Sequence, residues 1–336
     1  MVNIMMWFEK LVGFREETPE QVRKNLTVDG NVLRSRVNRR EFKCGELETP
    51  LLAELKERAA AAADRTGRIS VREAVADVQQ LHLDPSNTNA LFQVASQFNL
   101  LEMVCPQYTP EQGVAIYEND GTQGPACAIA AGAGTIYRNY FANVNGQIGQ
   151  SATNQIDCLA DLGIALGNQD SRLWEMKNGY ALASESGLDE ISNRLRSAGE
   201  TEFNDLGQLL RVGVHWDTQV TLDHSDHIVS QVYCSALPVA YLPYSSTHWE
   251  AFAKLVLNAS YEAAFCSAIL NQAKTGNNRL FLTLLGGGAF GNNDGWIVGA
   301  IRRALQLFAD TDLDVVIVSR RSSQYSVRQI VNEFST

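Results

Sequence analysis

The C-terminal part of this chain alternates short apolar runs with longer amphipathic segments, and this alternation constrains the fold most strongly. The apolar runs at 227–238, 280–285 and 314–318 have the length and composition of buried strands. Residues 249–273, 295–308 and 327–334 instead show helical periodicity. Buried strands that alternate with helices favour a three-layer α/β fold, in which a mixed, largely parallel sheet carries helices on both faces.

A glycine-rich turn follows the apolar run at 280–285. Gly286, Gly287 and Gly288 come first, and a helix begins after Asn293. Glycines let the backbone approach an anion closely, and the N–H groups at a helix start point toward it. Ligands of parallel sheets bind beyond the carboxyl ends of the strands, where this turn lies. We therefore expect a phosphate or diphosphate site, the alternative being a tight turn without a ligand. The turn has no Walker lysine, so a metal-assisted NTPase is not expected.

Composition narrows the classes of partner. The 336 residues are 45% hydrophobic and 20% charged, with a net charge of −10 and a pI near 5.1. This balance is typical of a globular protein and argues against a nucleic-acid-binding surface. We find no signal-peptide pattern at the N-terminus and no run near the ~20 apolar residues of a membrane helix. A soluble, cytoplasmic protein without nucleic-acid or membrane partners is expected. Six scattered cysteines with no C-x-x-C pair predict reduced, mostly buried thiols.

The first 70 residues differ in character from the rest. They are rich in charge, and residues 51–64 are strong helix formers. We predict an N-terminal helical extension over residues 1–70, packed on one domain over residues 71–336. In that domain the patterning predicts further strands at 91–96, 179–183 and 208–220, and further helices at 126–141, 152–166 and 188–198.

Several of these segments, taken in order, resemble the macrodomain fold, which binds ADP-ribose. The strand at 227–238 resembles the macrodomain strand that ends in a small residue and proline, and 249–273 resembles the long helix after it. Residues 282–293 resemble the second phosphate-binding loop of that fold. The resemblance covers roughly residues 70–336 and implies an ADP-ribose site. Its diphosphate would lie over Gly286, Gly287, Gly288, Ala289, Phe290, Gly291 and Asn292.

The Gly-Ala-Phe-Gly stretch at 288–291 is also similar to the corresponding loop of poly(ADP-ribose) glycohydrolases, a more distant relation. Those enzymes carry a Gly-Gly-Gly run followed by Gln-Glu-Glu, and this chain has neither before its helix at 126–141. The acid that performs their chemistry therefore has no counterpart, and their mechanism does not carry over.

The first macrodomain loop corresponds to the end of the strand at 91–96. Gln97 and Asn99, on either side of Phe98, could bond ribose hydroxyls. The alternative is a polar strand end whose amides bond to the backbone.

The segment 117–125 opens the following helix. Thr122 and Gln123 could line the diphosphate or the distal ribose, and Asp120 could reach a ribose hydroxyl. Asp120 precedes Gly121, and Asp-Gly is also a common turn.

Residues 214–228 contain a second cluster of polar side chains. They hold His215, His224, His227, Asp217, Asp223 and Asp226. In one interpretation the aspartates orient the ribose hydroxyls, activate water and stabilise positive charge on the sugar. In another, Asp and His side chains ligate a divalent metal, although no pair has a recognised metal spacing. In the third, the segment is an exposed, hydrated hairpin.

An aspartate-rich loop at this place resembles the MavL-like, arginine-specific branch of macrodomain-fold ADP-ribosylhydrolases. The resemblance implies an ADP-ribosylhydrolase that cleaves an N-glycosidic bond, with Asp217, Asp223 and Asp226 as catalytic residues. Its partners would be ADP-ribose and an ADP-ribosylated protein, with no cofactor or metal required. Two alternatives stay open, namely a non-catalytic ADP-ribose-binding module and a metal-dependent nucleotide phosphoesterase.

Overall fold

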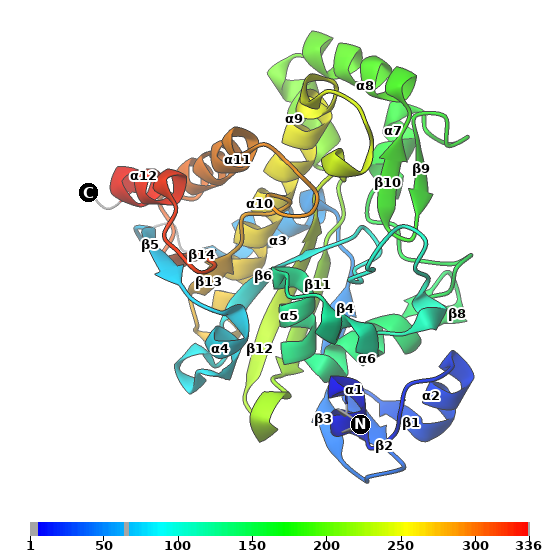
Figure 1. Ribbon diagram of the computed structural model, residues 1–336. Coiled ribbons are helices and arrows are strands. Elements are labelled where there is room, and N and C mark those ends of the chain that lie inside the picture. Colours follow the sequence, from blue (N-terminus) through cyan, green and yellow to red (C-terminus); the bar gives the residue numbers. More distant parts are fainter. Residues whose placement is uncertain (1–5, 64–66, 335–336) are drawn as a thin grey trace.

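The computed structural model describes residues 6–63 and 67–334, and its centre is a seven-stranded sheet (Figure 1). In spatial order the strands are β4 (Glu46–Glu48), β11 (Gly213–Gln219), β12 (Ile228–Ser235), β6 (Leu91–Ser96), β13 (Arg279–Leu282), β14 (Asp314–Ser319) and β5 (Ser70–Val75). The five strands from β12 to β5 are parallel. Strands β11 and β4 pair antiparallel at one edge. The predicted mixed, largely parallel sheet is confirmed.

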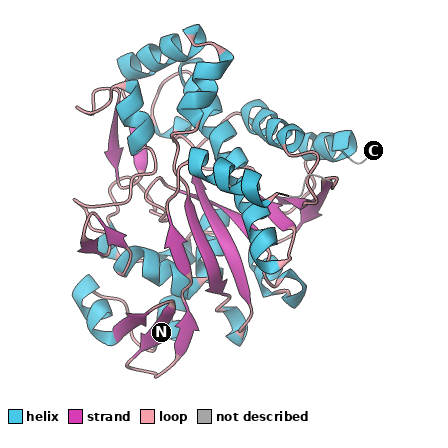
Figure 2. Ribbon diagram, turned by 180° about the vertical axis from the view of Figure 1, so that it is seen from behind, coloured by secondary structure: helices cyan, strands magenta, loops and turns pink. Residues whose placement is uncertain are grey.

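Helices cover both faces of this sheet (Figure 2). Successive side chains of a strand point to opposite faces, and β12 illustrates the result: Tyr233 packs under Arg138 of α6, whereas the Cys234 thiol donates to the Ser260 carbonyl of α10. One face carries α10 (Ser246–Thr275), surrounded by α3 (Leu52–Ala62), α8 (Glu185–Ser197), α9 (Glu200–Gly207) and α11 (Asp294–Leu307). The other carries α4 (Val78–Leu83), α5 (Gln123–Ala130) and α6 (Gly132–Tyr140). The three-layer prediction is therefore confirmed as well.

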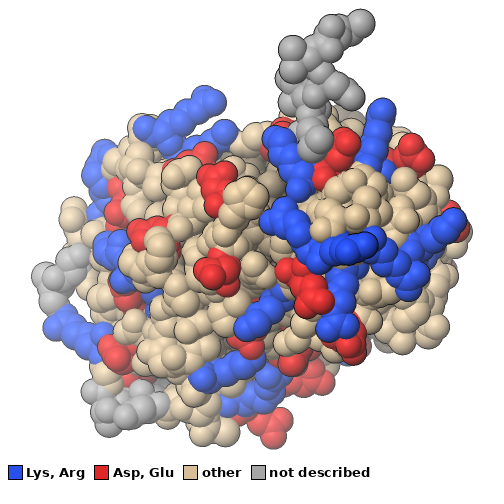
Figure 3. All heavy atoms as spheres, turned by 90° about the horizontal axis from the view of Figure 1, so that it is seen from below, with Lys and Arg blue, Asp and Glu red and all other residues tan. Residues whose placement is uncertain are grey.

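The N-terminal segment is not simply helical. It contains α1 (Trp7–Val12) and α2 (Pro19–Asn25), but also a small antiparallel sheet of β1 (Leu26–Asp29), β2 (Val32–Ser35) and β3 (Glu41–Lys43). The segment then supplies β4 to the central sheet, and α3 lies where a helix was predicted. Basic and acidic side chains are interspersed on this end of the molecule (Figure 3), and Arg34 pairs with both Asp29 and Glu41.

Several boundaries differ from the sequence prediction for local reasons. The helix predicted at 126–141 is two helices, because Ala131 leaves helical geometry at φ −109° and ψ 56°. Helix α12 (Tyr325–Phe334) lies beside β5 and α11, close to its predicted place. Only α7 (Ala160–Leu166) forms in the helix predicted at 152–166. Two hairpins lie outside the central sheet, β7 (Asn143–Val144) with β8 (Gln147–Ile148) and β9 (Trp174–Lys177) with β10 (Tyr180–Ala183).

Within the described residues, no helix is long and apolar enough to cross a membrane. Five of the six cysteines are buried and Cys105 is half-buried, in agreement with the predicted mostly buried thiols.

Candidate functional site

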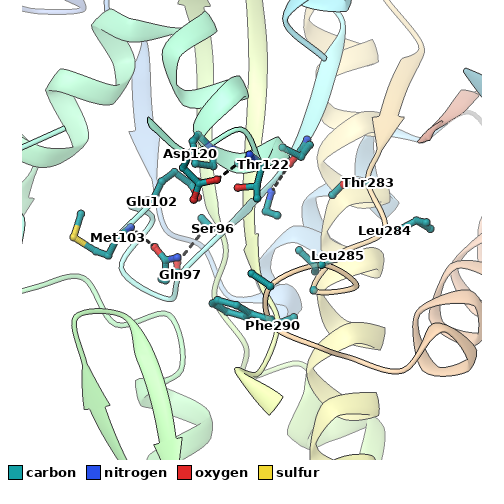
Figure 4. A pocket seen from close by; sticks show the side chains of 18 of the residues that line it. Ser96, Gln97, Glu102, Met103, Asp120, Thr122, Thr283, Leu284, Leu285 and Phe290 are labelled. Carbon is teal, nitrogen blue, oxygen red and sulfur yellow. Dashed lines mark hydrogen bonds between the residues drawn. The ribbon is translucent and has the colours of Figure 1, made fainter. Parts of the chain in front are cut away.

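A cavity of about 280 Å³ opens at the carboxyl ends of the central parallel strands (Figure 4). Ser96 at the end of β6, Ala236 after β12 and Thr283 after β13 form its floor. The glycine-rich turn after β13 forms one wall, and the start of α5 forms another. The cavity thus occupies the position at which a parallel sheet generally binds its ligands.

The glycine turn lines this cavity with Gly286, Gly288, Ala289 and Phe290. Gly286 and Gly291 have φ of 74° and 69°, values that favour glycine and let the chain fold back on itself. The turn is closed by bonds from the Gly291 N–H to the Gly288 carbonyl and from the Asn292 N–H to the Gly286 carbonyl. Within the described part of the chain, the N–H groups of residues 288–290 have no hydrogen-bond partner. Backbone N–H groups without a protein partner are available to bind an oxyanion.

The wall formed by α5 is fixed to the sheet by Gln123. Its side chain accepts from the Ala95 N–H and donates to the Gln93 carbonyl, in the manner of a short extra strand beside β6. Asp120 accepts from the Thr122 N–H at 2.8 Å, which orders the turn before the helix. Residues 120–124 are therefore held against the cavity.

Three aromatic rings close one end of the cavity. Tyr180, Tyr241 and Phe290 lie with ring centroids 5.1–5.5 Å apart. The Tyr180 hydroxyl donates to the Met103 carbonyl at 2.6 Å. The three rings pack on one another and make this end of the cavity aromatic.

A buried carboxyl lies beside the aromatic end. Glu102 is 5% exposed, and its Oε1 has no partner among the described residues. Burial raises the pKa of Glu102 well above its usual value; the positive charge of Arg138 opposes this rise, and Asp120 adds to it. Burial thus favours the protonated form of this carboxyl, and a general acid must carry a proton to donate.

Eight of the predicted ligand residues line the cavity. They are Gln97, Asp120, Thr122, Gln123, Gly286, Gly288, Ala289 and Phe290. The structure therefore brings together the glycine turn, the end of β6 and the start of α5, which are far apart in the sequence.

Five predicted ligand residues do not line this cavity. Phe98 is buried in the hydrophobic core. Asn99 is fully buried and donates to Gln155 while accepting from the Leu101 N–H, so it closes the strand as the alternative proposed. Asn292 donates to the Leu237 carbonyl and holds the turn in place. Gly287 and Gly291 shape the turn without lining the cavity.

The three aspartates predicted to be catalytic do not line this cavity. Asp217 pairs with Lys274 at 2.5 Å, and its N–H donates to Ser230 near the start of β12. The cavity is at the other end of that strand, ~17 Å away along the chain. These positions do not support a role for Asp217 at the cavity, although the catalytic prediction itself stays untested.

The other two aspartates are exposed. Asp223 lines a neighbouring hollow of about 450 Å³, which shares Asp120 and Arg320 with the cavity. Asp226 lines neither space.

The histidines of 214–228 are also dispersed. His215 is fully buried against Arg138, and His227 bonds to Ser225 and to the His82 carbonyl. Among residues 6–63 and 67–334, no three His, Cys, Asp or Glu side chains gather as metal ligands would.

Sequence reasoning missed several residues that line the cavity, namely Glu102, Met103, Tyr180, Tyr241, Thr283 and Arg320. One signal was available for Glu102, because it is the only charged residue in the apolar run 100–104, directly after a strand end. Tyr180 and Tyr241 come from a separate hairpin and from the loop after β12, and no local pattern connects them to the glycine turn.

No family model and no curated protein matches the chain. Among solved structures, a poly(ADP-ribose) glycohydrolase from Deinococcus radiodurans in complex with ADP-ribose is similar at 10% identity and a TM-score of 0.47, covering 96% of this chain and 100% of that one. A poly(ADP-ribose) glycohydrolase from Thermomonospora curvata, bound to the inhibitor ADP-HPD, is similar at 11% identity and a TM-score of 0.47, covering 98% and 99%. Similarity at this level does not establish a family, a substrate or a reaction for this chain.

Proposed function

We propose that this protein binds ADP-ribose in the cavity and hydrolyses the bond between ADP-ribose and a protein side chain. One observation carries the proposal: a single cavity joins the unpaired N–H groups of residues 288–290 to the buried carboxyl of Glu102. The first group suits a diphosphate, and the second suits acid catalysis at a glycosidic bond.

The diphosphate would lie over the glycine turn. Backbone N–H groups neutralise oxyanions without side-chain charge, so the net charge of −10 does not oppose this assignment. A Cβ added at Gly288 would meet no atom within 4 Å, which leaves open space for a ligand beside the turn.

The base would lie toward Arg320. Beyond the glycine turn a small hollow of about 80 Å³ is lined by Asp77, Val78, Val318 and Arg320, among others. A planar guanidinium stacks on a nucleobase, and a carboxylate accepts from an exocyclic amine. This hollow is therefore the proposed adenine side of the cavity.

The distal ribose and its linkage would lie at the aromatic end. Departure of the group on the ribose builds positive charge on the sugar, which the carboxyls of Glu102 and Asp120 would stabilise. Aromatic faces beside carboxyls also favour a cation, which supports arginine as the modified side chain. Water is the only co-substrate that this reaction needs.

The test is release of ADP-ribose from proteins modified on arginine, glutamate or serine, measured together with calorimetric binding of free ADP-ribose. We expect selective release from the arginine conjugate. Release from another linkage would overturn the arginine assignment. Binding without release would make the protein an ADP-ribose-binding module, and absence of both would overturn the proposal. Activity that disappears with a chelator would favour the metal-dependent phosphoesterase instead.

A further inference from the structure

The Glu102 carboxyl, which comes from the loop after β6, lies against the first turn of α5. The first residues of α5, namely Gln123, Gly124 and Pro125, include no acid. A Cβ at Gly124 would overlap the Glu102 carboxylate and the Ala95 carbonyl oxygen. The loop after β6 therefore places the Glu102 carboxyl in the space that a side chain at residue 124 would occupy.

The loop that carries Glu102 is tightly held. The Tyr117 hydroxyl accepts from the Glu102 N–H at 3.0 Å, and the Gln97 side chain accepts from the Met103 N–H at 2.6 Å. Leu100 adopts φ of 64°, a conformation that is uncommon outside glycine and marks a backbone fixed by its surroundings. The carboxyl itself lacks a partner for Oε1. A rigid backbone that presents an unsatisfied carboxyl to a cavity is unusual in a purely structural role.

A buried cation lies behind this loop. Arg138 is fully buried, and its hydrogen-bond partners among the described residues are neutral: the Leu100 carbonyl at 3.1 Å, the Thr135 hydroxyl at 2.9 Å and the His215 ring at 3.1 Å. Its guanidinium also lies 3.8 Å from the centre of the Tyr233 ring. A buried charge without a carboxylate partner is costly, and such a cost is retained where the charge has a use.

Arg138 acts on Glu102 in two ways. It holds the carbonyl of Leu100, two residues before Glu102, and its charge favours the ionised form of the carboxyl. The other titratable groups that face Glu102 are Asp120, Tyr117, Cys127, Tyr180 and Tyr233. Desolvation and Asp120 raise the pKa of Glu102, and Arg138 restrains that rise.

We infer that Glu102 is the catalytic acid of the proposed hydrolysis and that Arg138 is its positioning residue. This inference rests on the proposed function. The bond between the ribose C1 and the leaving atom breaks, and its electron pair goes to the leaving atom, which takes the proton of Glu102. Water then forms the new C–O bond at C1 and gives a proton to the Glu102 carboxylate. The acid is restored, and one water is consumed for each bond cleaved.

The first test is Glu102→Gln, which keeps the shape of the side chain and removes its acid. We expect ADP-ribose binding within about three-fold of the unaltered protein and a release rate lower by about 10²–10⁴-fold. Glu16→Gln is the matched control, because Glu16 is a half-buried carboxyl whose pKa is also raised by burial but which lies outside the cavity. Its release rate should stay within about three-fold.

Three outcomes would overturn the inference. Glu102→Gln could release ADP-ribose at the unaltered rate, or it could fail to bind ADP-ribose, which would make Glu102 a binding residue. Absence of release by the unaltered protein would instead overturn the proposed function, and this inference with it.

The second test concerns Arg138. If Glu102 is the acid, kcat falls as the pH rises through the pKa of Glu102. Removing the positive charge of Arg138 raises that pKa, so in Arg138→Met the fall of kcat should occur at a higher pH. Arg138→Lys retains the positive charge, so the pH limit at which kcat falls should stay near that of the unaltered protein. It loses the three hydrogen bonds of the guanidinium, so kcat itself should be lower. If Arg138→Met does not fold, Thr135→Val removes one acceptor and should lower kcat at an unchanged pH limit. An unmoved limit in Arg138→Met, or an unchanged kcat in Thr135→Val, would contradict the positioning role.

Discussion

His82 predicts a loss of stability in mild acid that can be worked out from its surroundings. The ring is fully buried and stacks on Phe92, with ring centroids 3.8 Å apart. Nδ1–H donates to the Val78 carbonyl, and Nε2 accepts from the Gln231 amide, which also donates to the Cys127 carbonyl of α5. A protonated ring would place an N–H against the Gln231 N–H. The fold therefore requires a neutral His82.

The magnitude follows from the difference in pKa between the folded and unfolded states. Burial lowers the pKa of His82 from 6.5 to about 4. Between these values the unfolded chain binds more protons, so the stabilisation present above pH 6.5 is lost as the pH falls toward 4. Linkage gives about 2 kcal/mol lost between pH 7.5 and pH 5.0, and about 3 kcal/mol when the loss is complete.

The assay is urea unfolding of the unaltered protein and of His82→Gln at pH 7.5 and pH 5.0. Glutamine cannot take up this proton, so the unaltered protein should lose about 2 kcal/mol more than the variant. His215 is also buried with a lowered pKa, but it is present in both proteins and its contribution cancels in the difference. His224→Gln, at an exposed position, is the matched control. Equal losses in the unaltered protein and in His82→Gln would refute this reasoning.

Three further predictions concern the site. Gly288→Glu should fold normally, because a Cβ there has open space, but it should lose ADP-ribose binding by at least about 100-fold because the new carboxylate repels the diphosphate. The control Gly288→Ala should still bind. Calorimetry measures both variants, and equal binding by the two would contradict the assignment of the diphosphate to the glycine turn. Gly124→Ala should displace the Glu102 carboxylate and also crowd the Ala95 carbonyl oxygen, so it should lower both the stability of the fold and, by at least about ten-fold, the release rate. Urea unfolding and a release assay measure the two effects, and an unaffected rate would show that residue 124 and Glu102 do not compete for space. Asp217→Asn should change the free energy of unfolding by less than about 1 kcal/mol, because the ion pair of Asp217 with Lys274 is partly exposed. It should also leave the rate of ADP-ribose release within about two-fold. A large loss of rate would instead support the catalytic role that the sequence suggested.

The sequence was most informative where local pattern and burial agree. The strands β6, β12, β13 and β14 and the helices α10 and α11 lie close to their predicted places, because buried strands and long amphipathic helices leave strong periodic signals. The glycine turn was found for the same reason, since its backbone geometry requires residues of one type.

The N-terminal segment and the catalytic side of the cavity were harder to predict. Strands β1 to β4 have three or four residues each, too few to establish a period of two. The aspartates at 217, 223 and 226 were predicted to be catalytic because they are close together in the sequence. They belong to the segment that joins β11 to β12, near the start of β12, whereas the cavity lies beyond the end of that strand. Glu102 is a single residue whose importance depends on burial, and on Arg138 approaching from another helix, neither of which a local pattern contains.

The pairing of β4 with β11 means that the N-terminal segment covers one edge of the central sheet. Glu46, Leu47 and Glu48 satisfy the outer backbone groups of β11, and Glu48 also accepts from the indole N–H of Trp216 at 2.7 Å. A chain shortened to begin at residue 51 would leave this strand with a bare row of donors and acceptors, a template on which other chains can add. We expect such a fragment to self-associate through β11, whereas a fragment that retains β4 keeps this edge covered.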